Sequence, residues 1–115
     1  MHENAIDIPK GTTHTIEITL YDESGNRYAR TSGDIVRFGV KHHPDDATCV
    51  ISKTGTYNPG NFYTVTLSPE DTANLIMGEQ YWYDIGLQTA SGDFFQVVEV
   101  SPFNVKRAIT KKVTT

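Results

Sequence analysis

The chain has a single cysteine and no long apolar run. Cys49 has no partner for an internal disulfide, so the fold must be stable through packing alone. No apolar stretch approaches the roughly 20 residues that a membrane-spanning helix needs. The opening Met1-His-Glu-Asn4 lacks the basic and apolar parts of a secretory signal. These absences predict a non-secreted domain, and 115 residues suffice for one hydrophobic core.

The sequence also lacks the excess of positive charge that is typical of nucleic-acid-binding proteins. Its net charge is −4, and the last ten residues contain four cations and no acid: Lys106, Arg107, Lys111 and Lys112. The rest of the chain therefore carries −8, which argues against non-specific binding to DNA or RNA. The basic tail is interpreted either as a solvated end or as a segment that docks onto an acidic neighbouring subunit.

What the sequence does contain is a series of short runs in which apolar and polar residues alternate. Thr, Val, Ile, Tyr and Phe dominate these runs, as in β-strands, and turn residues separate them at regular intervals. We expect about seven to nine strands and one helical turn, in an all-β antiparallel sandwich. The predicted strand regions are residues 6–8, 12–21, 27–32, 35–41, 49–53, 62–67, 81–87, 94–100 and 103–105.

Residues 68–87 contain the clearest local signals in the sequence, a helical turn followed by a strand. Ser68 is placed to cap a short helical turn near residues 69–76, Asp71 to bond back to the backbone of the cap, and Gly78 to provide a left-handed C-terminal stop. The following strand alternates, so Tyr81 and Tyr83 should point into the core together with Ile85 and Leu87. This stretch predicts a structural corner made by Ser68, Asp71, Gly78, Tyr81 and Tyr83.

Three groups of residues resemble catalytic or metal sites, and each has a more ordinary interpretation. His42, His43, Asp45 and Asp46 flank Pro44, which predicts a loop rather than convergent metal ligands. Cys49 precedes Val50 and Ile51 and is predicted to be a small core residue. Glu70, Asp71 and Asp84 crowd together in sequence, but the first two suit a helix N-terminus. We therefore predict no catalytic residue, metal or cofactor.

Four aromatic residues form a possible interaction surface. Alternation puts Trp82 on the polar face of its strand, with Asp84, and one of Phe94 and Phe95 must also face outward. Tyr57 and Phe62, at the turn over residues 57–61, complete the set; equally, the Tyr57 loop or the terminal segments could cover the exposed pair. Such aromatics suit a protein interface, and the alternative is a carbohydrate-binding or adhesion platform.

The whole chain resembles the immunoglobulin-like sandwich domains of phage and prophage tail and baseplate proteins, such as the N-terminal domain of siphophage baseplate upper proteins. The strongest part of the resemblance is residues 68–85, with Ser-Pro-Glu-Asp-Thr-Ala followed by Tyr-Trp-Tyr-Asp-Ile. Shorter matching runs are residues 8–11, 15–20, 22–26 and 36–41. The run Glu-Asp-Thr-Ala is also similar to the one before strand F of antibody variable domains, where a tyrosine anchors the corner. Tyr81 or Tyr83 would take that role here.

The resemblance implies a structural protein rather than an enzyme. We expect a sandwich over residues 1–106 and a basic tail over 107–115, in a tail, baseplate or neck component of a virion. Its partners would be other phage structural proteins, with self-association possible and no nucleic acid or membrane involved. It would be made in the bacterial cytoplasm and then enter the virion. The chain lacks both sandwich cysteines of antibody domains, so its core should hold by packing.

Overall fold

The computed structural model describes residues 5–22, 24–28 and 32–107. Within this part of the chain the elements are β1 (Ile6–Pro9), β2 (His14–Ile18), β3 (Ile35–Lys41), β4 (Ile51–Thr54), β5 (Thr56–Asn58), β6 (Phe62–Leu67), α1 (Pro69–Ala73), β7 (Tyr81–Gln88) and β8 (Phe94–Lys106). No helix of the described residues is long and apolar enough to cross a membrane. The predicted all-β class is confirmed.

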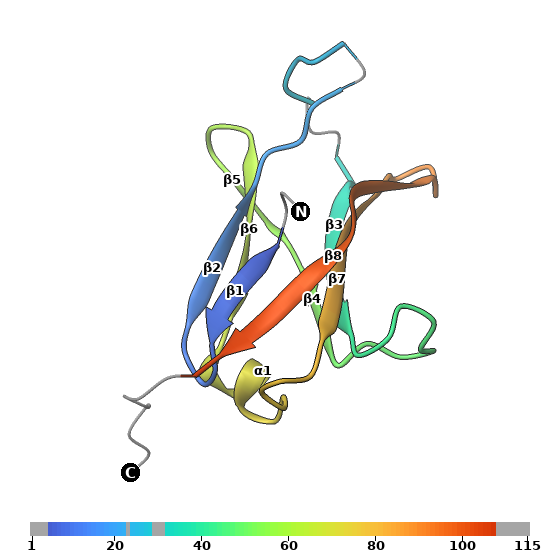
Figure 1. Cartoon of the computed structure of the whole chain (residues 1–115). Coiled ribbons are helices and arrows are strands. Elements are labelled where there is room, and N and C mark those ends of the chain that lie inside the picture. Colours follow the sequence, from blue (N-terminus) through green and yellow to red (C-terminus); the bar gives the residue numbers. More distant parts are fainter. Residues whose placement is uncertain (1–4, 23, 29–31, 108–115) are drawn as a thin grey trace.

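Two sheets pack face to face and enclose the core (Figure 1). One sheet has the strand order β1-β8-β7-β3-β4, and the other has the order β2-β6-β5. The chain changes sheet between β4 and β5 and again after β6, where α1 closes one end of the sandwich. This arrangement is that of an immunoglobulin-like sandwich in which β1 and β4 flank the central three strands of the larger sheet.

The prediction of purely antiparallel pairing is wrong for one pair of strands. β1 runs parallel to β8, with Ile6 opposite Phe103 and Pro9 opposite Lys106, whereas all other pairs within the two sheets are antiparallel. The chain reverses after Pro9 and enters β2 in the opposite sheet, so β1 and β2 occupy different sheets instead of forming a hairpin. Alternation of apolar and polar residues predicts which side chains of a strand face the core. It does not predict whether the neighbouring strand runs parallel or antiparallel.

The core follows the predicted alternation closely. β3 buries Val36, Phe38 and Val40, and β7 buries every second residue from Tyr81 to Leu87. β4 adds Ile51, and β1 and β8 add Ile8, Phe103 and Val105. From the other sheet and the residues that follow β2, the core receives Ile18, Leu20, Tyr63, Val65 and Leu67. The outer side of β7 therefore carries Trp82, Asp84, Gly86 and Gln88, as predicted.

Three aromatic rings lie at the centre of this core. The Phe38 and Tyr83 ring centroids are 5.5 Å apart, and Phe103 lies 6.4 Å from Phe38 and 6.5 Å from Tyr83 in edge-on geometry. Such tilted and edge-on pairs add attraction to the burial of their apolar area. Burial also raises the pKa of the Tyr83 phenol, so this ring stays neutral over the physiological range.

The corner is built from side-chain bonds to the backbone. The Ser68 N–H donates to Asp71 Oδ2 at 2.7 Å, and Lys53 Nζ lies 3.0 Å from the same oxygen, which ties α1 to β4. At the start of β7, Tyr81 Oη accepts a hydrogen bond from the Ile76 N–H at 3.0 Å. Of the two tyrosines considered for the corner, Tyr81 therefore has this role, and Tyr83 packs in the core.

Two details of the corner and of β8 differ from the prediction. α1 ends at Ala73 with Asn74 as its C-cap, so Gly78, with φ of 90°, serves the turn before β7 instead of ending the helix. β8 is continuous through Ser101 and Pro102, where a break was predicted. β1 pairs with β8 only from Phe103 onward, so Pro102 is at an edge position where a strand tolerates a missing N–H.

The turn after Tyr21 and the β7–β8 hairpin close through hydrogen bonds, whereas residues 56–58, which lie between two predicted strand regions, form the unpredicted strand β5 and shorten the turn predicted there to residues 59–61. Asp22 Oδ1 accepts from the Ser24 and Asn26 N–H groups at 2.9 and 3.0 Å, and Gly25 has a φ of 84°. The β7–β8 hairpin closes through the Thr89 N–H and the Asp93 carbonyl oxygen at 2.9 Å. The predicted weak strand over 27–32 includes residues 29–31, which lie outside the described residues.

Replacing Tyr83 by alanine should destabilise the domain by about 3–5 kcal/mol, because it removes one of the three central rings and leaves a cavity. The measurement is the free energy of unfolding in denaturant. The matched control is Tyr57→Ala, which truncates a partly exposed ring on an edge strand and should cost much less. An unchanged midpoint for Tyr83→Ala would show that this ring does not support the core.

Asp71→Asn should cost about 1–2 kcal/mol at neutral pH, as the loss of a helix cap does. Partial burial acts to raise the pKa of the Asp71 carboxyl, but the hydrogen bond from Ser68 and the charge of Lys53 together outweigh it, so the pKa is lowered from 3.8. The stabilisation is therefore present above 3.8 and is lost as the pH falls through the folded-state pKa. We expect the difference in the free energy of unfolding between the natural protein and Asp71→Asn to shrink as the pH falls through this range. A difference that stays constant with pH would show that the ionised Asp71 carboxylate does not provide the stabilisation.

Candidate functional site

The outer face of the five-stranded sheet contains a shallow hollow of about 230 Å³ between β3, β7, β8 and the loop after β3. Its lining residues are Gly39, Lys41, Pro44, Cys49, Trp82, Tyr83, Asp84 and Val100. Gly39 leaves the space open because it has no side chain: a Cβ at this position would lie 3.1 Å from Cys49 Sγ and 3.9 Å from Asp84 Oδ1. The hollow thus combines an indole, a thiol, a carboxylate and an ammonium group.

The two charged residues of the hollow come from neighbouring strands but do not pair. Asp84 Oδ2 accepts a hydrogen bond from Gln96 Nε2 of the neighbouring strand β8 at 3.0 Å. In the described part of the chain, no Lys, Arg or His nitrogen lies within 4.0 Å of the Asp84 carboxylate. Lys41 is opposite Trp82 in the register of β3 and β7. Among residues 5–22, 24–28 and 32–107, the half-buried Asp84 carboxylate is therefore bonded to a neutral amide and to no cation.

Cys49 is exposed, and its prediction as a core residue is wrong. β4 begins at Ile51, two residues later than predicted, so Cys49 lies in the preceding loop, where the alternation of the strand does not apply. The Val50 N–H donates to the Val40 carbonyl oxygen at 2.7 Å and holds the end of this loop against β3. This contact brings the Cys49 thiol over Gly39 on the outer face.

A patch of exposed apolar side chains lies beside the hollow on β8. Phe94 is 59% exposed and Phe95 56% exposed, and Val97 and Val100 are also exposed. Phe94 covers Gly86 of β7, where a Cβ would collide with the phenyl ring. In the register of β7 and β8, Phe94 is opposite Gln88 on the outer side, whereas Phe95 is opposite the core residue Leu87, so Phe94 is the ring that shares a face with the hollow. We call Phe94 and Val100 the hairpin patch. Large rings that are left in water near a strand hairpin are typical of surfaces that contact another molecule.

The structure does not bring the four predicted aromatics together. Trp82 and Phe94 share the outer face of the larger sheet, whereas Tyr57 and Phe62 belong to β5 and β6 in the other sheet. The Tyr57 ring packs edge-on against Tyr63 with centroids 5.4 Å apart, and it closes the edge of that sheet. The sequence places these rings next to turns, but it does not show which strands belong to which sheet. The assignment of β5 and β6 to the smaller sheet puts Tyr57 and Phe62 away from Trp82 and Phe94.

The histidine loop forms contacts with the corner. His42 Nε2 lies 3.1 Å from Glu79 Oε2, and its ring lies 5.2 Å from Tyr81 and 4.4 Å from His43. Among the described residues there is no group of three or more His, Cys, Asp and Glu side chains that converges on a metal-sized site. Glu70 and Asp71 are in α1, as predicted for a helix N-terminus, and Asp84 lies apart from them on the sheet.

Several residues of this face were not singled out from the sequence. Gly39 looks like an ordinary strand glycine, and its importance depends on Cys49 lying above it. Val97 and Val100 are three residues apart, so strict alternation would put them on opposite faces. The pairing of β7 with β8 has register shifts between Tyr83 and Ile85 and between Ile85 and Gly86, which change which side chains of β8 face outward. The only sequence signal for these irregularities is the length of the β8 run.

The Cys49 thiol should react fully with Ellman's reagent in the folded protein, and the attached nitrobenzoate should quench the emission of Trp82, the only tryptophan of the chain. Both effects follow from the shared hollow. The control variant carries Cys49→Ser and Ser24→Cys; its label is attached at a remote turn and should leave the emission unchanged. Equal quenching in both proteins would show that Cys49 and Trp82 are not neighbours.

No family profile and no curated protein matches this sequence. Among solved structures, the chain is similar to murine CRIg, with 11% sequence identity, a TM-score of 0.47, and coverage of 93% of this chain and 96% of that chain. A similarity at this level is a likeness of overall shape and carries no information about a site.

Proposed function

We propose that this domain is a non-enzymatic structural component of a phage or prophage virion, in a tail, baseplate or neck, and that it acts through protein–protein contacts. The observation that carries the contact role is the hairpin patch beside the Trp82 hollow, where the exposed Phe94 ring lies on the outer face of the sheet. Aromatic anchors on a preformed surface contribute most of the energy in protein interfaces. The virion context is supported by the resemblance of residues 68–85 to phage tail domains.

The shape of the face agrees with this role. Phe94 is supported from below by Gly86, and Trp82 lies between Lys41 and Pro102 of the neighbouring strands, so both rings are held by the sheet. Little side-chain entropy is then lost when a partner binds, since the rings are already placed. The protein would be made in the bacterial cytoplasm and then be incorporated into the particle.

The test is a search for this protein in particles released from an induced lysogen and purified on a density gradient, followed by light scattering of the pure protein. We expect the protein in the particle fraction, and oligomers or complexes with purified tail proteins that weaken at least tenfold with Trp82→Ala or Phe94→Ser. Tyr57→Ala, on the other sheet, is the matched control. A strictly monomeric protein that is missing from particles and binds no tail protein would overturn the proposal.

A second function is a carbohydrate-binding or adhesion module. It is favoured by the hollow itself, because an indole wall flanked by Lys41 and Asp84 offers the stacking surface and the polar groups that a sugar requires. A glycan array separates the two functions, with Trp82→Ala as the control. Absence of binding to every glycan would remove this alternative.

A further inference from the structure

We infer that the hollow of one copy receives a cationic side chain from the basic C-terminal segment of a second copy. The inference rests on the proposed contact role of this face and names its partner. It starts from Asp84, whose carboxylate lines the hollow and has no cation within 4.0 Å in the described part of the chain. A partner that covers this face would remove water from Asp84, and a buried carboxylate requires a positive charge to offset that cost.

The walls of the hollow suit a long cationic side chain. Trp82 offers the face or edge of an indole, and Pro44 and Val100 provide apolar contacts for a methylene stem. A guanidinium or ammonium group beside both a carboxylate and an indole gains an ion pair and a cation–π contact together. Lys41 also lines the hollow and opposes this binding, so its removal should strengthen the interaction.

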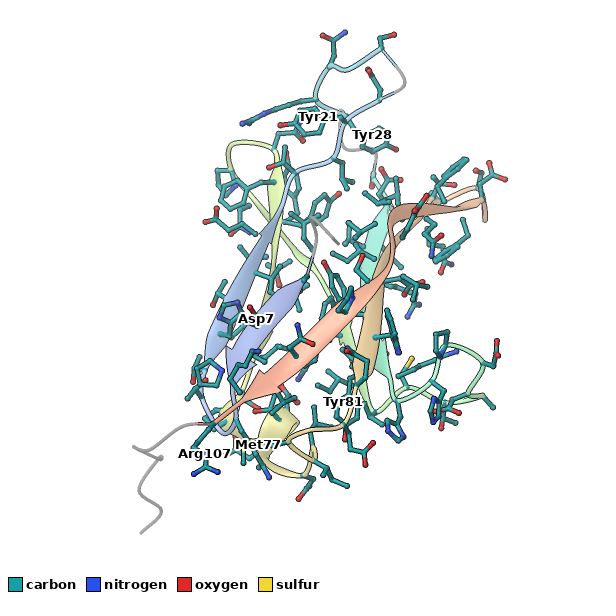
Figure 2. The ribbon with its side chains drawn as sticks, viewed as in Figure 1. Asp7, Tyr21, Tyr28, Met77, Tyr81 and Arg107 are labelled. Carbon is teal, nitrogen blue, oxygen red and sulfur yellow. The ribbon has the colours of Figure 1, made fainter. Side chains whose placement is uncertain are left out.

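The chain itself supplies a segment with matching charge. The last ten residues carry four cations and no acid. The other 105 residues therefore carry a charge of −8, which gives the net charge of −4. Arg107 is exposed where β8 ends, at the same end of the sandwich as Met77 (Figure 2). Beyond it, residues 108–115 include Lys111 and Lys112 and lie outside the described residues.

The exit point of the segment favours a second copy over the same chain. The Lys10 N–H bonds to the Lys106 carbonyl oxygen at 2.8 Å, so the chain leaves the sheet at its β1 edge. The hollow lies beside Val100, roughly 20 Å back along β8 at about 3.3 Å per residue. To fill its own hollow the segment would have to reverse and run back across the sheet. Continuing outward, eight residues reach at most about 29 Å, enough to cross the face of a neighbour.

The experiment uses two full-length variants that each lose one half of the contact. Asp84→Asn keeps the basic segment and loses the acceptor. The second variant carries Arg107→Gln, Lys111→Gln and Lys112→Gln, which keeps the acceptor and loses the segment. Sedimentation velocity should show self-association of the natural protein, weakened at least tenfold in either variant and by 0.5 M salt. A mixture of the two variants should restore a 1:1 complex, because one complete contact is available.

A second readout uses Trp82 as the only tryptophan. We call the variant with Arg107→Gln, Lys111→Gln and Lys112→Gln the neutral-segment variant. Addition of the peptide of residues 105–115 should change the Trp82 emission of this variant saturably. The same peptide with its four cations replaced by glutamine should have no effect, and Lys41→Gln should tighten binding severalfold.

Three outcomes would overturn the inference. One is no response to the peptide; another is self-association that is insensitive to Asp84 and to the segment. The third is an emission difference between the natural protein and the neutral-segment variant that does not depend on protein concentration, which would place the segment on its own chain. If Trp82→Ala and Phe94→Ser still weaken assembly while Asp84→Asn does not, this inference fails and the proposed function stands.

Discussion

The packing of three aromatic rings between the sheets is the interaction on which the rest of this domain depends. Antibody-type sandwiches join their sheets through a disulfide that packs against a tryptophan. Here Tyr83 lies two residues after the corner tyrosine, where such a domain has its second cysteine, and it packs with Phe38 and Phe103. All three rings belong to the larger sheet, so they fix the registers of β3, β7 and β8 relative to one another. The geometry of the outer face follows from those registers.

The corner sets the direction in which the chain enters this sheet. Asp71 closes the start of α1 and pairs with Lys53, and Tyr81 holds the turn before β7 through the Ile76 N–H. With Tyr81 fixed on the inner side, alternation along β7 must place Trp82 and Asp84 outside. The corner therefore determines which residues lie on the outer face of the sheet.

The face that results is uneven in a way that suits contact with another protein. Glycines at 39 and 86 lower the surface, and Cys49 and Phe94 from neighbouring segments lie over them. This leaves a hollow that contains one carboxylate and one indole, on the same face as the exposed Phe94 ring of the hairpin patch. The sequence combines an acidic body with a basic C-terminal segment, and a head-to-tail contact between copies joins two different, complementary parts of the same chain.

The sequence by itself determined the class of the fold, the inner and outer sides of the longer strands, and the corner. Each of these depends on neighbours in the chain: alternation places Val36, Phe38 and Val40 inside, and the spacing of Ser68 and Asp71 allows the capping bond. Only the tertiary structure decided that β1 is parallel to β8, that Pro102 lies within a continuous strand, and that Cys49 is exposed. It also decided that Trp82 and Phe94 share a face from which Tyr57 and Phe62 are absent. These features depend on which strands become neighbours, and that choice is made by packing between segments far apart in the sequence.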